Sequence, residues 1–267
     1  MGLRDFVERL IGTATAPGGG PRVTGPPPSG NGASSFHLVW DAPPVPLTAA
    51  EVTIEVVEPP SVPKLYFWAM QVNFERGVGR VGGAHVGLQY HPAYPDAGAV
   101  NWGGYADAGG ELDGSVSALP SALDNINTRT YRWEPGRRYR YRVSRSPERG
   151  WRGSIVDLAT GDETVIRDLW IEADHLTGPM VWSEVFADCD EPSTAVRWTD
   201  PVVTTADGER IGIEAVRLNY QTNGDGGCAN TDTTVDTSSG TAGFLQRTAT
   251  ARTNPSGTRL VLPTRRA

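Results

Sequence analysis

Apolar and polar residues alternate with a period of two along several short stretches of the chain. The clearest stretch is 137–144, where Tyr139, Tyr141 and Val143 alternate with arginines. Successive side chains of a β-strand point to opposite faces, so this pattern predicts a strand with one buried face and one wet face. Glycine, proline and aspartate punctuate the neighbouring stretches from residue 131 to 186. The segment therefore predicts antiparallel strands joined by hairpins.

Two earlier stretches, 65–74 and 84–91, alternate in the same way, with aromatic and aliphatic residues at the even positions. The odd positions carry Phe67 together with several side chains that can donate and accept hydrogen bonds. On this face we expect Gln71, Asn73, His85, Gln89 and His91. The same alternation in the stretch 180–186 puts Trp182 and Glu184 on one strand face, which could be the same face of the sheet.

About a dozen such strands, without an internal repeat, predict an all-β fold over residues 35–267. The expected architecture is a two-sheet antiparallel jelly-roll sandwich. Residues 92–130 read as loop-rich. The remaining segments are an amphipathic helix at 1–12 and a flexible Pro/Gly-rich linker at 13–34. A helix of three turns needs a surface to dock on, either a protein partner that contacts residues 3–11 or its own domain.

Composition narrows the range of functions. The formal net charge of −7 argues against a nucleic-acid partner, because phosphate binding requires a basic surface. No apolar run reaches the ~18 residues of a membrane span, and the N-terminus lacks the pattern of a secretory signal. We expect a soluble protein of unspecified compartment. Cys189 and Cys228 could form one disulfide or remain two buried thiols.

The strand residues 67–74, 83–90, 131–143 and 151–170 together resemble the concanavalin A-like lectin/glucanase sandwiches. More narrowly, the chain resembles the DUF3472-type proteins, in which a strand like Tyr-Phe-Trp-Ala-Met-Gln precedes a Gly-Leu-Gln strand and a Tyr-Arg-Tyr-Arg-Val hairpin. The resemblance covers about residues 35–200. It implies a concave sheet face that binds extended saccharides.

Saccharides are bound by aromatic rings that stack on sugar faces and by planar polar groups that pair with hydroxyls. The predicted ligand-binding residues are Gln71, Asn73, His85 and Gln89 on the strands, with Asn101, Trp102 and Tyr105 arching over them. The alternative is structural: tryptophans are often core residues, and the polar face of an antiparallel sheet can simply be solvated.

Catalysis has two candidate groups. Gln89-Tyr90-His91 resembles the Gln-x-His pattern of alginate-lyase-like sandwiches, where the histidine can abstract a proton, but the segment that supplies the acid of those enzymes is missing. Glu184, Asp188 and Asp190 are spaced as carboxylates along one strand face, as glycoside hydrolysis would need. The glucanase pattern Glu-x-Asp-x-x-Glu is absent, and a solvated strand end would explain these acids equally well.

A metal has weaker sequence support. Asp225, Asn230 and Asp232 lie in a Gly-rich loop and could offer oxygen ligands to Ca²⁺, although their spacing matches no known calcium loop and suits an ordinary polar turn. No other cofactor is expected. The sequence therefore predicts a non-catalytic domain that recognises an oligo- or polysaccharide. The alternatives are a polysaccharide lyase or glycoside hydrolase on the same face, and an assembly protein that docks through its N-terminal helix.

Overall fold

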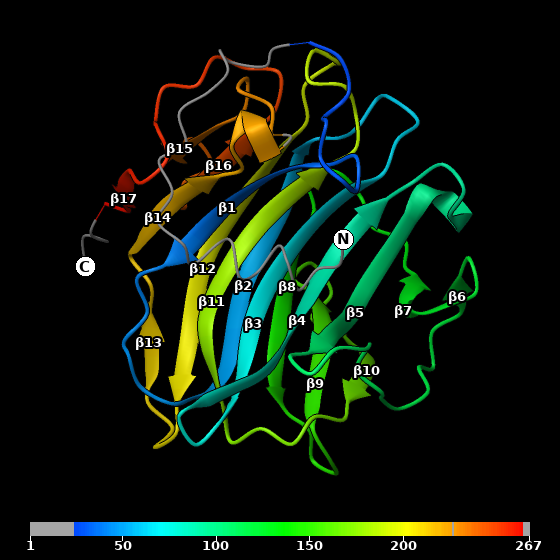
Figure 1. Ribbon diagram of the computed structural model, residues 1–267, viewed down its shortest axis with the longest axis vertical. Coiled ribbons are helices and arrows are strands. Elements are labelled where there is room, and N and C mark those ends of the chain that lie inside the picture. Colours follow the sequence, from blue (N-terminus) through cyan, green and yellow to red (C-terminus); the bar gives the residue numbers. More distant parts are fainter. Residues whose placement is uncertain (1–23, 226, 264–267) are drawn as a thin grey trace.

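The computed structural model describes residues 24–225 and 227–263, and the regular secondary structure of this part of the chain is almost entirely β-strand (Figure 1). Its only helical elements are two single turns of 3₁₀ helix, η1 (Pro95–Ala97) and η2 (Asn223–Asp225). No helix of the described residues is long and apolar enough to cross a membrane. The predicted helix at 1–12 and most of the linker lie outside the described residues.

All strand pairings are antiparallel and fall into two sets. The first sheet runs in the order β17 (Arg259–Val261), β14 (Ala215–Tyr220), β1 (Ser34–Trp40), β11 (His175–Val185), β3 (Tyr66–Arg76), β4 (Gly79–Tyr90), β5 (Gly98–Ala106), β7 (Asn125–Thr130) and β6 (Ser121–Ala122). In Figure 1 this sheet curves across the view from β14 to β5.

The second set forms the other layer. Its order is β15 (Asp232–Asp236), β16 (Gly243–Arg247), β12 (Ala195–Thr205), β2 (Leu47–Glu58), β8 (Arg138–Arg145), β9 (Trp151–Asp157) and β10 (Glu163–Leu169), with β13 (Arg210–Gly212) beside the far half of β12. One β-pairing links the two sets, between Leu176 of β11 and Leu47 of β2. The antiparallel all-β prediction is confirmed, and the jelly-roll connectivity stays a prediction.

The hydrophobic core lies between the two layers. The predicted inward positions of β8, among them Tyr141, are buried in it, and so are the even-numbered residues of β3 from Tyr66 to Phe74. The Tyr141 hydroxyl reaches across the sandwich, where it accepts a hydrogen bond from the Leu88 amide (2.8 Å) and donates one to the Trp68 carbonyl (3.1 Å). Because both backbone groups are buried, this hydroxyl ties the second layer to β3 and β4 of the first.

The prediction of a loop-rich segment at 92–130 is wrong for its centre, which forms the full strand β5. Glycine disfavours strands, yet here a side chain would block the sheet: a Cβ on Gly104 would lie 2.1 Å from the Gly83 carbonyl oxygen of β4. The described end of the predicted linker is held in place as well. Gly25 donates its amide proton to Asp190 and accepts a hydrogen bond from the Cys189 amide.

Candidate functional site

The predicted polar residues of β3, β4 and β11 share the face of the first sheet that points away from the core. Register places His85 of β4 opposite Gln71 of β3, and Trp182 of β11 opposite Ala69. The core neighbours are even-numbered on β3 and β4, such as Trp68 and Val86, and odd-numbered on β11, such as Val181. We call the following set the outer polar face: His37, Gln71, Asn73, His85, Gln89, Asn101, Trp182 and Glu184. The face follows from the period-two alternation, as predicted.

Trp182 is the centre of an aromatic cluster on this face. Its ring lies edge-on to Phe67, with centroids 4.9 Å apart, and edge-on to His85 at 5.7 Å. His37 of β1 approaches it from the other side at 6.4 Å. The indole Nε1 donates a hydrogen bond to the Gln71 side-chain oxygen at 3.2 Å. Indole, imidazole and amide groups are thus held in fixed mutual positions by rings that pack on one another.

Three residues of the outer polar face keep polar atoms that have no hydrogen-bond partner among the described residues. These atoms are the side-chain oxygens of Asn73 and Asn101 and Nδ1 of His85, and all three are shielded from solvent. The Asn101 amide nitrogen does have a partner, since it donates to the Thr128 hydroxyl at 2.8 Å. Buried polar atoms are normally satisfied, so this group of atoms calls for a partner.

Both histidines of the face are neutral at physiological pH. Burial lowers the pKa of His85 to about 4, because the charged imidazolium loses its solvation. Burial also lowers the pKa of His37 to about 4, partly opposed by its Nδ1 contact with the Asn219 carbonyl oxygen. Sequence analysis missed His37, although alternation with Phe36 and Leu38 could have placed it on this face.

Glu184 is the one carboxyl group of the outer polar face. It lies on β11 opposite Ser35 of β1, and its carboxylate accepts a hydrogen bond from the Asn31 amide nitrogen at 3.0 Å. Burial raises the pKa of Glu184 to about 7, and the hydrogen bonds from Asn31 and Ser35 partly oppose the rise. At neutral pH this carboxyl can therefore both hold and release a proton.

The predicted row of three carboxylates along one strand face is wrong. Strand β11 ends at Val185, before the chain reaches Asp188 and Asp190. Asp190 accepts a hydrogen bond from the Gly25 amide at 2.8 Å, and the turn is closed by the Glu191 carboxylate, which accepts from the Asp188 amide. Alternation predicts a shared face only as far as the strand continues.

The other predicted ligand-binding residues have different environments. Gln89 accepts a hydrogen bond from the Tyr94 hydroxyl at 3.1 Å, while His91 follows the end of β4 and accepts one from the Ala93 amide. Tyr105 is 41% exposed near the end of β5. The expectation that Trp102 arches over the sheet is wrong: Trp102 of β5 pairs with Val86 of β4 and is fully buried in the core, so its ring offers no stacking surface to a saccharide on the outer polar face.

The proposed calcium ligands are engaged in internal contacts. Asp232 accepts hydrogen bonds from Tyr220, Thr253 and Asn254, and the Asn230 amide donates to the Cys189 carbonyl. Asp225 accepts a hydrogen bond from Thr222 at 2.7 Å. Within the described residues no group of three or more His, Cys, Asp or Glu side chains is arranged to hold a metal ion.

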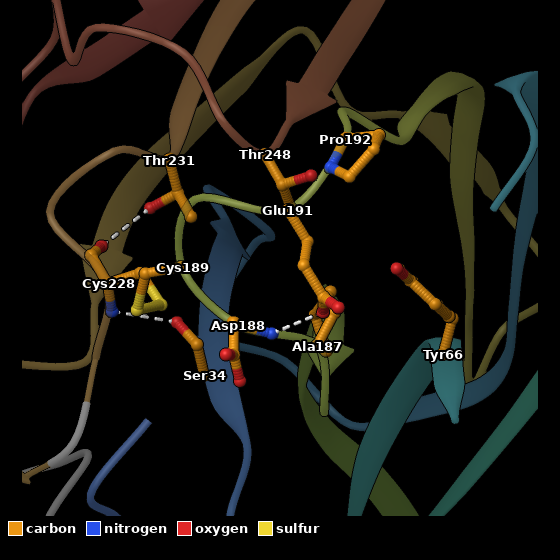
Figure 2. A pocket seen from close by; sticks show the side chains of 11 residues that line it. Ser34, Tyr66, Ala187, Asp188, Cys189, Glu191, Pro192, Cys228, Thr231 and Thr248 are labelled. Carbon is orange, nitrogen blue, oxygen red and sulfur yellow. Dashed lines mark hydrogen bonds between the residues drawn. A yellow bond between two sulfur atoms is a disulfide. The ribbon is translucent and has the colours of Figure 1, made fainter. Parts of the chain in front are cut away.

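A small pocket opens beside the disulfide between Cys189 and Cys228, which settles the pairing left open by the sequence (Figure 2). The Cys228 amide donates to the Ser34 hydroxyl at 2.9 Å, and the Thr231 hydroxyl donates to the Cys228 carbonyl. These contacts join the start of β1 to the loop after β14. We assign this pocket a structural role, since its hydrogen bonds mainly connect its own walls.

The sequence matches no protein-family profile and no curated protein, so the resemblance to DUF3472-type proteins gains no support from a family match. Several solved structures are similar in shape, among them the following three. Scytalido-glutamic peptidase with a peptide-based transition-state analogue shares 12% identity over 80% of this chain and 96% of its own (TM-score 0.44). Peanut lectin with a nine-residue peptide shares 10% over 84% of each chain (TM-score 0.28), and an alginate lyase shares 10% over 88% and 82% (TM-score 0.29). Values this low transfer no function to this chain.

Proposed function

We propose that the outer polar face binds a hydroxyl-rich ligand, an oligo- or polysaccharide. The observation that carries the proposal is the group of unpartnered buried atoms on Asn73, His85 and Asn101. Amide oxygens only accept hydrogen bonds, so two of these three atoms require donors from a ligand. Sugar hydroxyls supply donors at close spacing along an extended chain.

The aromatic cluster supports the same proposal. Trp182 packs edge-on to Phe67 and donates a hydrogen bond to Gln71, which combines apolar rings with a planar polar group as saccharide sites do. These groups sit on the strands of a sheet, so their positions are fixed before the ligand binds. A pre-organised site loses less conformational entropy on binding.

Removal of the two amide oxygens tests the proposal. We expect the double variant Asn73→Ala/Asn101→Ala to bind a glycan at least about tenfold more weakly than the parent chain, because two ligand hydrogen bonds are lost. A glycan array identifies the ligand, and calorimetry with that ligand measures the affinity.

The matched control is Asn254→Ala, which removes an amide whose nitrogen donates to Thr233 on the second layer. The control should bind like the parent chain. Equal affinity in the double variant and the control would refute the site, as would an array on which the parent chain binds no glycan.

A second function, hydrolysis or elimination within the bound polymer, is favoured by one observation: burial raises the pKa of Glu184 to about 7. A carboxyl group of this kind serves as a general acid or base near neutral pH. We expect any cleavage of a bound glycan to disappear in Glu184→Gln while binding is retained. The readout is shortened product by mass spectrometry, and a variant that still cleaves at the parental rate would exclude Glu184 as the catalytic group.

A further inference from the structure

Two buried arginines lie together at one edge of the sandwich interior, away from the outer polar face. Arg129 of β7 pairs with Val100 of β5 and is 6% exposed, and Arg167 of β10 is 3% exposed. The two guanidinium groups are close enough for Arg129 to lower the pKa of Arg167, in addition to the larger effect of burial. Two like charges thus occupy the same desolvated region.

Neither arginine forms a salt bridge with a carboxylate in the described part of the chain. The Nε atoms of both are shielded from solvent and have no hydrogen-bond partner there. The other buried arginine of the described residues is paired: Arg197 contacts Glu55 and Asp236. Buried charges are normally neutralised by a partner, and these two lack one.

The neighbouring acids do not fill this role. Glu111 and Asp113 are near enough to raise the pKa of Arg167, yet the Glu111 carboxylate accepts a hydrogen bond from the Asn127 amide nitrogen. The Asn127 oxygen in turn accepts from Arg167 at 2.8 Å. Asn127 therefore stands between the acid and the guanidinium and leaves the Nε side of Arg167 unpaired.

The surrounding residues fix the position of the Arg167 guanidinium and add another donor. A Cβ on Gly114 would lie 2.4 Å from a terminal nitrogen of Arg167, so only glycine allows the guanidinium its position. Trp102 packs on Gly153, the residue that pairs with Arg167, and its Nε1 has no hydrogen-bond partner among the described residues. The edge thus holds three N–H donors without acceptors.

We propose that Arg129 and Arg167 form a binding site for a small oxyanion. Guanidinium groups donate paired hydrogen bonds to the oxygens of sulfate, phosphate or carboxylate, and two of them match a doubly charged tetrahedral anion best. The bound anion satisfies the unpaired donors and cancels the repulsion between the two arginines. The site is separate from the proposed saccharide face and does not depend on it.

Calorimetric titration of the full chain with sodium sulfate, sodium phosphate and sodium acetate, at ionic strength held constant with chloride, tests the site. We expect one sulfate or phosphate per chain and an affinity at least about tenfold lower in Arg129→Gln, because charge-assisted hydrogen bonds are lost. Arg138→Gln, at an exposed position of β8, is the matched control and should bind like the parent chain. Preferential acetate binding that is lost in Arg129→Gln supports the site with a carboxylate ligand.

Thermal unfolding distinguishes loss of anion binding from loss of stability in Arg129→Gln. In chloride alone Arg129→Gln should melt no lower than the parent chain, since it removes one of two repelling charges. Dilute sulfate should raise the melting temperature of the parent chain and of Arg138→Gln, but not that of Arg129→Gln. No anion binding by the parent chain, equal binding by Arg129→Gln, or an equal fall in melting temperature with and without sulfate would each overturn the site.

Discussion

Replacing Glu184 with glutamine keeps the shape of the side chain and removes its charge. Burial disfavours the carboxylate and raises the pKa of Glu184 from 4.5 to about 7 in the folded chain. The unfolded chain has the ordinary pKa, so between these values the folded protein binds the extra proton. The stability contributed by Glu184 is fully present below pH 4.5 and is lost as the pH rises through about 7.

The magnitude follows from the two pKa values. A difference from 4.5 to about 7 corresponds to about 3 kcal/mol at about 1.4 kcal/mol per pH unit. Glutamine carries no charge to bury at any pH. We therefore expect Glu184→Gln to be more stable than the parent chain by up to about 3 kcal/mol at pH 8, and by much less at pH 4.

The two buried histidines act in the opposite direction. With pKa values of about 4 in the folded state and 6.5 when unfolded, His37 and His85 each make stability rise with pH over that window. Around pH 5.5 the contributions of the two histidines to stability rise with pH, and that of Glu184 falls. The three groups together therefore give the free energy of unfolding a slope of about +1.4 kcal/mol per pH unit. In Glu184→Gln the slope should double to about +2.7 kcal/mol per pH unit.

Urea unfolding of both proteins from pH 4 to pH 8 measures these slopes. The other carboxylates titrate identically in the two chains, so the difference between the curves isolates Glu184. Parallel curves with no pH-dependent gap would refute the assignment of a desolvated carboxyl at this position. A gap that widens toward acid would reverse the sign and show that the folded state favours the carboxylate.

Two further changes test how the layers are held together. Tyr141→Phe should lower the free energy of unfolding by about 2 kcal/mol, because the Leu88 amide and the Trp68 carbonyl lose their bridging hydroxyl. The control Tyr139→Phe removes only the hydrogen bond from the Glu134 amide and should lower it less. Equal losses in urea unfolding would contradict this difference. Cys189→Ser/Cys228→Ser should lower the free energy of unfolding by about 2–4 kcal/mol, since the disulfide closes a loop with a sequence separation of 39. An unchanged urea midpoint would count against that contribution.

Alternation predicted the face of a strand wherever the strand itself was recognised. Tyr141 and Val143 are buried, and Gln71, His85, Trp182 and Glu184 share the outward side of the first sheet, as their positions in the sequence require. This success has a simple cause. Period two depends only on the backbone of each strand, and it needs no knowledge of which strands are neighbours.

The failures occurred where the sequence hides the element or its end. Gly103 and Gly104 made the segment of β5 look like a loop in the sequence, so the pairing of Trp102 with Val86 in the core was not predicted. The prediction that Glu184, Asp188 and Asp190 share a strand face assumed that the strand continues, but β11 ends at Val185, before the turn that contains Cys189. The approach of Arg129 to Arg167 joins β7 to β10 across the sandwich and leaves no periodic trace in the sequence.

The charges of the outer polar face bear on which saccharide it would take. His37 and His85 are neutral above pH values of about 4, and Glu184 is uncharged below a pH of about 7. Between these limits all ionisable groups of the outer polar face are neutral, and above them the face becomes negative. No lysine or arginine belongs to this set of residues, so a uronate polymer would find no cation there to balance its carboxylates. The face therefore suits a neutral glycan, and a lyase acting on uronates is the less favoured of the catalytic alternatives.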